Sequence, residues 1–444
     1  MATLPQAVAA DLPPYDRTAS PAIVHLGVGA FARAHLAVYA DDLLRAGWPA
    51  TVAGVSLRSP RAEAQLGPQD GLFTVTEREP SAPPSTRVIG SLTSIETGAD
   101  AACRRIANPT TTLVTLTITE KGYELDGPEA APAVLAAALD ERRGGSDDPL
   151  VIASLDNVLD NGHVLRAQVL RAADGRGAGL GEWIEAHVGF PRSVVDRMVP
   201  AATREDRAEI EMSLGIVDEA ATVAEAHRSW VLEAVDGLPP LGDVGVEVVS
   251  GVEPYQQRKL WLLNGPHSAL AYVGLLAGHH TVADAATNPS IGRFVRRLVD
   301  DVLAVVPQDA RASAAFAEQS LRRFANPALG HTCAQVGADG SRKLPQRLLP
   351  VMSRRRARGI STDRFDLVVA AWLAAVTSAD VRSVGLSAIE DPLAGPLRDA
   401  MHRGGPQAAI RAVFGSEHGD LAVGIADAYD RIVRDGLGAL EERS

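Results

Sequence analysis

The stretch Ile23-Val-His-Leu-Gly-Val-Gly-Ala-Phe-Ala-Arg-Ala-His35 decides the fold, because it reads as a strand, a tight turn and the start of a helix. Gly27 and Gly29 allow a sharp turn and a close approach to a pyrophosphate, and Ala32 is small enough for contact between helix and strand. A phosphate at this turn lies at the positive end of the following helix. The residues that we predict to bind a dinucleotide here are Gly27, Val28, Gly29, Ala30 and Phe31. The alternative is a glycine turn without a ligand.

Around this turn, the first half of the chain alternates β-rich runs with helical stretches. Strands are predicted at residues 22–26, 50–57, 73–77, 111–119 and 150–155. Residues 35–46 have the apolar spacing of a helix. Strands that alternate with helices indicate a largely parallel sheet with helices on both faces. We therefore expect an α/β, Rossmann-type, doubly wound N-terminal domain.

The second half has a different pattern, because strand signals nearly vanish after about Gly251. Helical periodicity covers residues 260–277, 291–306, 312–324, 362–378 and 421–437. The apolar run at residues 244–249 still resembles a strand, so we place the domain boundary just after it. The expected division is a dinucleotide-binding domain at residues 1–251 and a mostly α-helical substrate and catalytic domain at residues 252–444.

The composition is typical of a globular protein with a large core: 444 residues, 46% hydrophobic and 22% charged. A net charge of −12 argues against nucleic-acid binding, and no apolar run is long enough to span a membrane. Two cysteines cannot form a disulfide framework, and no zinc ligand set is recognisable, so no metal is expected. Residues 1–20 lack the apolar core of a signal peptide, which makes the cytoplasm the expected location.

The end of the second predicted strand, Leu57-Arg58-Ser59-Pro60-Arg61, bears on the choice of cofactor. An acid at this point usually holds the ribose hydroxyls of NAD, but the nearest acids are Glu63 and Asp70, further along. Arg58 and Arg61 could instead receive the 2′-phosphate of NADP. We expect NAD, leave NADP open, and count Arg58 among the cofactor-binding residues.

Lysine is rare in this chain, with three among 43 cationic side chains, and one of the three lies in an unusual segment. Lys259, Asn264 and His267 fall within nine residues of an otherwise apolar stretch. Pro266 removes a backbone donor there, and the resulting break could turn the three side chains toward one space. Burial lowers the pKa of a lysine toward that of a general base, whereas arginine stays protonated. The alternative is structural, with a capping asparagine, a core histidine and a lysine that reaches water.

A second polar turn, Ser154-Leu-Asp-Asn-Val-Leu-Asp-Asn-Gly162, follows the predicted strand at residues 150–155. Doubly wound sheets bind ligands at the carboxyl ends of their strands. Asn157 could therefore donate an amide hydrogen bond to a developing alkoxide. The alternative is that these residues simply make a turn.

Together these segments resemble the long-chain mannitol dehydrogenase family, which includes mannitol 2-dehydrogenases and fructuronate reductases (mannonate oxidoreductases). The resemblance extends from about Ile23 to Arg347. The matching motifs are Gly27-Val-Gly-Ala-Phe-Ala-Arg-Ala-His35, Thr115-Leu-Thr-Ile-Thr-Glu-Lys-Gly-Tyr123, Asp156-Asn157 with Asn161-Gly162, Val195-Asp-Arg-Met-Val-Pro200, Lys259-Leu-Trp-Leu-Leu-Asn-Gly-Pro-His-Ser268, Arg323-Phe-Ala-Asn-Pro327 and Asp339-Gly-Ser-Arg-Lys-Leu-Pro345.

The resemblance implies a metal-independent reaction with Lys259 as the catalytic base. It implies that Asn157 and Asn264 hold the alkoxide and that His267 binds substrate oxygens. Asp196 and Lys343 match positions at or near the polyol site. The chain departs from the family pattern at four positions, which are Ala32, Leu155, Gln256 and Trp261. None of these departures removes the lysine or the two asparagines.

The first hypothesis is thus an oxidoreductase that transfers hydride between a nicotinamide cofactor and C2 of a sugar alcohol, as between mannitol and fructose. The alternative within the same chemistry is a D-mannonate oxidoreductase, because residues 195–203 and 339–347 resemble the fructuronate reductases. Lys343 and Arg342 could then hold the carboxylate. Outside this class, the chain could be a catalytically inactive nucleotide-binding sensor or a structural protein. The expected partner is a small sugar alcohol, ketose or sugar acid, and the expected state is a monomer or small homo-oligomer.

Overall fold

The chain divides into two compact units, Met1–Glu253 and Pro254–Ser444. The computed structural model describes residues 2–4, 14–80, 82–118, 120–123, 127–377, 389–415 and 419–440. Each unit has its own buried apolar core.

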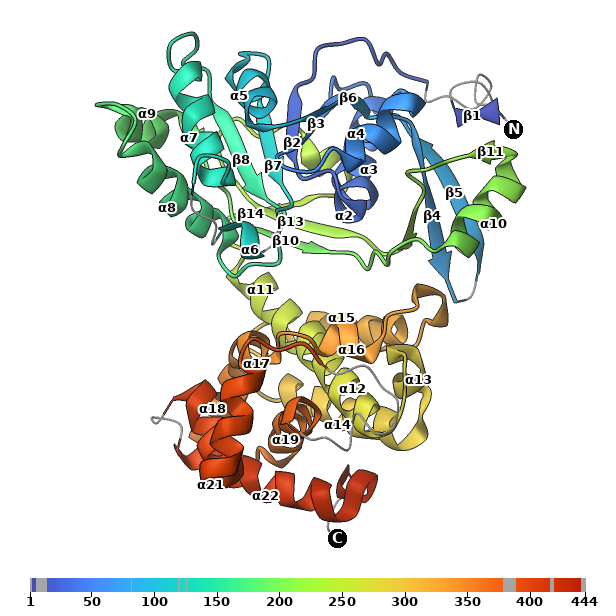
Figure 1. Cartoon of the computed structure of the whole chain (residues 1–444), viewed down its shortest axis with the longest axis vertical. Helices are drawn as coiled ribbons and strands as arrows, with labels where there is room; N and C mark the ends of the chain where they lie inside the picture. Colours follow the sequence, from blue (N-terminus) through green and yellow to red (C-terminus); the bar gives the residue numbers. More distant parts are fainter. Residues whose placement is uncertain are drawn as a thin grey trace. The chain divides into compact units, whose positions relative to one another are not determined.

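A six-stranded parallel sheet forms the centre of the first unit (Figure 1). Its strands, in spatial order, are β6 (Leu92–Thr97), β3 (Val52–Ser56), β2 (Ile23–Leu26), β7 (Leu113–Leu116), β8 (Leu150–Ser154) and β9 (Val188–Gly189). Ile23 is in register with Val52 on one side and Leu113 on the other, so β2 lies in the middle of the sheet. The strand order reverses beside β2, and this reversal is where doubly wound sheets bind ligands. The expected Rossmann-type domain is confirmed.

Helices cover both faces of this sheet, because side chains alternate between the two faces along each strand. Ile23 points to a core that includes α3 (Leu36–Arg45). Val24 and Leu26 point to the opposite core. The helices packed on that opposite side are α5 (Ala99–Ala107), α7 (Ala131–Arg142), α8 (Asn161–Ala173) and α9 (Leu180–His187).

The strand expected at residues 73–77 exists, but it does not belong to the central sheet. It is β4 (Phe73–Glu79), which pairs antiparallel with β5 (Ala82–Ile89) and parallel with β12 (Thr222–Glu225). The place beside β3 is taken by β6, which the sequence pattern did not single out. The short connection after Glu79 returns the chain as a hairpin, and strand patterning does not say which edge a strand joins.

Two further small sheets and several short elements complete the first unit. The strands are β1 (Ala2–Thr3) paired with β11 (Ile216–Val217), and β10 (Ser193–Asp196), β13 (Ser229–Glu233) and β14 (Glu247–Val249) in a second sheet. The helices are α2 (Ala30–Ala34), α4 (Arg61–Leu66), η1 (Gly67–Gln69), α6 (Glu120–Tyr123), α10 (Arg204–Leu214) and η2 (Leu241–Val244). The expected strand at residues 111–119 is shorter as β7, and Thr119 lies outside the described residues.

The second unit is helical, and one isolated β-bridge joins Thr281 and Thr332. Its elements are α11 (Glu253–Lys259), η3 (Leu260–Asn264), α12 (Gly265–Leu276), α13 (Val282–Thr287), α14 (Pro289–Leu303), α15 (Ala310–Phe324), η4 (Pro327–Leu329), α16 (Cys333–Gly337), α17 (Gly340–Arg347), α18 (Leu349–Ala357), α19 (Asp363–Thr377), α21 (Ala394–Phe414), α22 (Gly419–Asp435) and η6 (Gly436–Leu440). α12 is buried on nearly all sides and packs on α13, α14, α16 and α19. Ser378, the last residue of one expected helix, lies outside the described residues.

Among the described residues, no helix is both long and apolar enough to cross a bilayer.

Candidate functional site

The glycine turn follows directly on the central strand of the sheet. Gly27 has a φ of +100°, and a Cβ at this position would lie 2.2 Å from the carbonyl oxygen of Thr117. Only glycine fits these two constraints. By contrast, a Cβ on Gly29 would have no protein atom within 4 Å. The turn is therefore closed on its inner side and open on its outer side, as a backbone that binds a phosphate must be.

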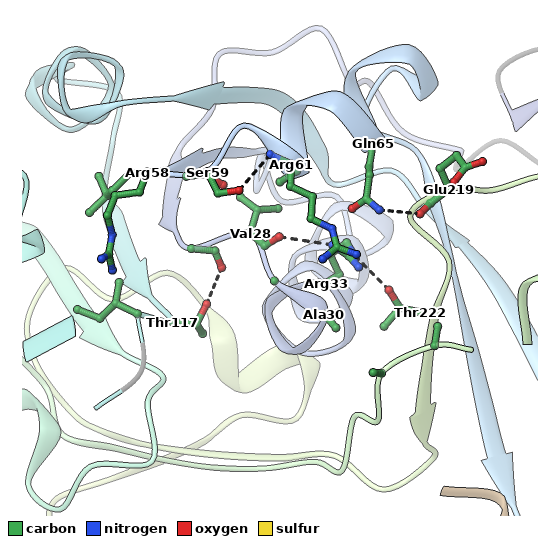
Figure 2. Close-up of a pocket in the computed structure, with 18 of the residues that line it drawn as sticks. Val28, Ala30, Arg33, Arg58, Ser59, Arg61, Gln65, Thr117, Glu219 and Thr222 are labelled. Carbon is green, nitrogen blue, oxygen red and sulfur yellow. Dashed lines mark hydrogen bonds between the residues drawn. The ribbon is translucent and has the colours of Figure 1, made fainter. Parts of the chain in front are cut away.

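A pocket of about 530 Å³ opens at this turn (Figure 2). The residues that border it belong to the turn, to the segment after β3 and to the end of β7. Its volume is in the usual range for small-molecule sites. The sequence-predicted residues that line it are Gly27, Val28, Gly29, Ala30 and Arg58. Phe31 does not line it; its ring stacks on His35 with the ring centroids 5.0 Å apart.

The part of the pocket rim that follows β3 in the chain is basic. Arg58 lies on the loop after β3 and Arg61 is the first residue of α4; both line the pocket (Figure 2). The two acids that sequence reasoning considered for the ribose are engaged elsewhere. Glu63 accepts a hydrogen bond from Thr97 at 2.7 Å, and Asp70 pairs with Arg17 at 3.0 Å. Neither acid lines the pocket, so no carboxylate follows β3 at the position that usually holds NAD.

Arg33 connects the turn to a distant segment of the unit. Its Nη1 donates to the carbonyl of Val28 at 3.4 Å, and its Nε donates to the hydroxyl of Thr222 at 3.1 Å, as Figure 2 shows. Sequence reasoning did not assign Arg33, although it stands within the quoted turn. Its side chain lines the pocket and adds to the positive charge there.

The polar turn after β8 is largely structural. The carboxylate of Asp156 accepts from the backbone N–H of Ile118 at 3.1 Å and from the hydroxyl of Tyr123 at 3.0 Å. The amide of Asn161 donates to the carbonyl oxygens of Ser154 and Asp156, at 3.2 and 3.1 Å. These bonds fix the turn, and Asn157, the residue with a predicted catalytic role, is exposed upon it.

Asp196 is the last residue of β10 and is 9% exposed. Its Oδ2 lies 3.5 Å from Nε2 of His227. The neighbouring Arg197 donates to the carbonyl of Glu225 at 2.9 Å and pairs with Glu77 at 2.5 Å. Sequence reasoning missed His227, which has no local motif around it. Only its position opposite β10 draws attention to it.

In the second unit, Lys259 and Asn264 lie on either side of an irregular turn of helix. Lys259 is half-buried at the end of α11, Asn264 is buried, and the turn between them is π-helical. The N–H of Gly265 donates to the carbonyl of Leu260, five residues back. On a regular α-helix, side chains five residues apart would point about 140° apart. The wider π-turn, with its hydrogen bond from residue i+5 to residue i, reduces this angle.

The third member of this segment, His267, belongs to the next turn, on α12. Its ring stacks on Phe324 at 4.8 Å and lies 6.2 Å from the ring of His331. Burial, followed by positive charge on nearby side chains, holds the pKa of His267 well below its usual range. These cationic side chains are His331, Arg347, Arg323 and Lys343. His267 is therefore neutral near pH 7, with one nitrogen that donates and one that accepts.

Arg347 holds the same segment from α17. Its guanidinium is buried and donates to the hydroxyl of Ser268 at 2.8 Å and to the carbonyl of Asn264 at 3.4 Å. The predicted residues thus form two groups. Asn157 and Asp196 belong to the first unit, whereas Lys259, Asn264, His267 and Lys343 belong to the second. No group of three or more metal-ligating side chains occurs among the described residues.

Comparison with known proteins narrows what these two units do. Residues 21–241 match the Rossmann domain of mannitol dehydrogenases, and residues 251–435 match the mannitol dehydrogenase C-terminal domain. The protein is therefore an oxidoreductase that acts on a CH–OH group. More narrowly, it belongs to the mannitol dehydrogenase family, which confirms the resemblance inferred from its motifs.

Individual relatives are consistent with this family assignment. An uncharacterized oxidoreductase, YeiQ, of Escherichia coli (strain K12) is 34% identical over 98% of this chain and 96% of its own. D-mannonate oxidoreductase of the same organism is 35% identical over 84% of this chain and 83% of its own. A solved structure of Pseudomonas fluorescens mannitol 2-dehydrogenase, a ternary complex with NAD and D-mannitol, is 31% identical. It matches with a TM-score of 0.85 over 96% of this chain and 95% of that chain.

Proposed function

We propose that the protein transfers hydride between a nicotinamide dinucleotide and C2 of an open-chain sugar alcohol or sugar acid, with Lys259 as general base and without a metal. The observation that supports this proposal is the π-helical turn between Lys259 and Asn264, which reduces the angle between their side-chain directions relative to a regular α-helix. On this proposal, a side chain that can exchange a proton acts together with one that can hold an oxyanion. This is the pair of functions that carbinol oxidation requires.

The chain's own groups would act as follows. In oxidation, the neutral amine of Lys259 takes the hydroxyl proton while the carbinol carbon gives up its hydride. When bound, the nicotinamide ring supplies the acceptor or donor of that hydride. In reduction, the ammonium of Lys259 returns the proton to the carbonyl oxygen. The amides of Asn264 and Asn157 would donate to the oxygen on which negative charge develops.

His267 would bind and orient the substrate rather than exchange the proton. Its low pKa keeps the ring neutral, so it offers one donor and one acceptor to neighbouring hydroxyl groups. Asp196 and Lys343 are proposed as further substrate contacts. The glycine turn fits a pyrophosphate, because Gly27 tolerates no side chain and Gly29 opens to the pocket.

A sugar alcohol of the mannitol type is the first candidate substrate. A sugar acid such as mannonate is the second, and one observation favours it. Arg347 donates hydrogen bonds to the carbonyl of Asn264 and to the hydroxyl of Ser268, which brings a buried guanidinium to this segment. A carboxylate near this guanidinium gains Coulomb energy that a neutral polyol does not. D-mannonate oxidoreductase of E. coli, at 35% identity, is among the relatives that support this candidate.

For the cofactor, we propose NAD, with acceptance of NADP through the basic rim of the pocket. The NAD complex of the mannitol 2-dehydrogenase, at 31% identity, supports the former. Arg58 and Arg61, together with the lack of a pocket carboxylate after β3, support the latter. The cytoplasmic location and the oligomeric state stay predictions.

The test is the replacement of Lys259. Lys259→Ala should lower kcat by at least about a thousandfold while the Kd for NADH stays within about threefold. Lys259→Arg is the matched control, because it keeps the charge but cannot act as a base, and it should be equally inactive. Substantial turnover by Lys259→Arg would rule out the lysine as the base. Assays of fructose and fructuronate with NADH and NADPH would identify the substrate class beforehand. Wild-type protein that binds these cofactors without turnover of any such substrate would instead be a sensor.

A further inference from the structure

His25 is a buried histidine for which the proposed reaction has no use. It lies in β2, two residues before the glycine turn, and is 1% exposed. Desolvation lowers its pKa to about 4, so the imidazole is neutral at any working pH. A polar ring in the middle of a sheet core is costly unless its nitrogens are satisfied. Both nitrogens of His25 are satisfied, and this pattern of bonds shows what the ring does.

The hydrogen bonds of His25 determine which nitrogen carries the proton. Nε2 lies 3.0 Å from Oγ1 of Thr117 and 3.1 Å from the carbonyl oxygen of Gly27. The Thr117 hydroxyl itself donates to that same carbonyl at 2.6 Å, so its oxygen accepts from Nε2–H. Nδ1 is then the acceptor for the hydroxyl of Thr115, at 2.8 Å. Thr115 faces His25 in the register of β2 and β7.

Three donors therefore converge on the carbonyl oxygen of Gly27. They are the hydroxyl of Thr117, the N–H of Gly29 at 2.8 Å and Nε2–H of His25. Together they hold this carbonyl toward the interior of the sheet. The peptide bond between Gly27 and Val28 is trans, like every peptide bond in the described chain, so its N–H points opposite to its C=O. The N–H of Val28 is thereby directed away from His25.

The side chain of Val28 supports this orientation. It is 6% exposed. Its Cγ2 packs against Gly54 of β3 so closely that a Cβ added to Gly54 would lie only 2.7 Å from it. The valine side chain is thus packed beside Gly54 of the sheet, and Val28 is among the residues that line the pocket. An outward main-chain N–H at this turn is the donor that a diphosphate oxygen requires.

We propose that His25 is a positioning residue for the diphosphate of the cofactor: by holding the Gly27 carbonyl inward, it aims the N–H of Val28 at a phosphate oxygen. This rests on the proposed nicotinamide dependence of the protein. His25 touches neither substrate nor cofactor, and it acts through one peptide plane. Its contribution falls on ligands that carry a diphosphate and not on the adenosine alone.

The test compares His25→Met with His25→Gln in the full-length protein. Methionine fills a similar volume but donates no hydrogen bond, whereas the amide of glutamine places an N–H near the former Nε2. His25→Met should raise the Kd for ADP and for NADH about tenfold, as the loss of one well-aimed hydrogen bond implies, and leave the Kd for adenosine unchanged. His25→Gln should restore ADP binding to within about threefold of wild type. The KM for NADH should follow the Kd, while kcat at saturating NADH changes less than about threefold.

A second variant keeps the proposal testable if His25→Met does not fold. Thr115→Val removes only the hydroxyl that holds Nδ1 and should produce a smaller loss of ADP affinity in the same direction. Equal losses for ADP and adenosine, or wild-type ADP binding in a folded His25→Met protein, would overturn the role of His25. Failure of the proposed function is a separate result, because wild-type protein would then bind neither NADH nor NADPH.

Discussion

The glycine-turn pocket and the Lys259 segment are built on opposite principles. The pocket is made mainly by main chain: Gly27 excludes a side chain, and buried residues beneath it orient its peptide. The Lys259 segment depends on side chains, with Lys259 and Asn264 on either side of a π-helical turn. A binding site for a common cofactor can rest on backbone geometry, whereas a proton-transfer site needs particular side chains at particular angles. Mutations at the glycine turn and in the Lys259 segment should therefore separate cofactor binding from proton transfer.

The largest effect is expected from a mutation that disrupts the glycine-turn pocket and leaves the Lys259 segment unchanged. Gly27→Ala forces an alanine to a φ of +100° and brings its Cβ to 2.2 Å from the carbonyl of Thr117. The turn must move, and the affinity for NADH should fall by about a thousandfold, with a loss of stability of about 2–3 kcal/mol. Gly29→Ala is the matched control, since its Cβ meets no protein atom, and it should weaken NADH binding without loss of stability. Fluorescence titration measures the affinity for NADH, and urea unfolding measures the stability. Equal losses of stability in the two variants would contradict the difference expected between Gly27 and Gly29.

A second effect concerns the buried histidines of the first unit. The pKa of His25 is lowered to about 4 and that of His35 to about 3, in both cases mainly by desolvation. The folded state therefore binds fewer protons than the unfolded state between about pH 6.5 and pH 4. Stability is complete above pH 6.5 and is lost as the pH falls through this range. Between pH 7 and pH 4.5, the free energy of unfolding of His25→Gln should fall by about 2–3 kcal/mol less than that of the wild type. Urea unfolding at the two pH values measures this difference. Identical losses would show that His25 does not carry this dependence.

The chemistry of the second unit should respond without any change in cofactor binding. Asn264→Ala removes the amide proposed to hold the developing oxyanion and should lower kcat by about a hundredfold, as for other donors of this kind. The Kd for NADH should stay within about twofold. Ser268→Ala is the control, because it removes a hydroxyl bonded to Arg347 on the same helix without removing the amide. A loss of NADH affinity in Asn264→Ala would show that the two sites are not separable in this way.

The smallest effect sharpens the pocket's preference between cofactors. Arg58→Ala or Arg61→Ala should each lower kcat/KM for NADPH about tenfold, because a charged hydrogen bond to the 2′-phosphate is lost. The value for NADH should change less than about threefold. The ratio of the two specificity constants is the measurement. An unchanged ratio in both variants would show that these arginines do not read the 2′-phosphate.

The sequence predicted most clearly what depends on local chemistry. The turn from Gly27 to Gly29 could be recognised because both demands on it, tight geometry and close approach, are met by glycine alone. The helical second half could also be predicted, since the apolar periodicity of a helix is a local property of the sequence. The pairing of β4 could not be predicted in this way, because an alternating strand fits either the central sheet or a hairpin at its side.

Within the candidate site, residue types were readable but angles were not. Pro266 indicated a break in the helix, yet nothing local specifies a π-turn five residues long. Asp156 and Asn161 stood in the quoted turn, but their structural role became visible only from their bonds to Ile118 and Ser154. His25 was likewise in plain view within the first motif. Its partners, Thr115 and Thr117, lie 90 residues or more away along the chain, so their contact is a property of the fold.

The π-turn also says something about how such a site can arise. It amounts to one additional residue within a helix that otherwise runs from Glu253 to Leu276. Insertion of a single codon into an ancestral regular helix is enough to rotate one side chain relative to another by a quarter turn or more. The hydrophobic packing of α12 on its neighbours can survive such an event. A new pair of reactive groups can thus appear in one evolutionary step, ahead of any change in the residues that surround it.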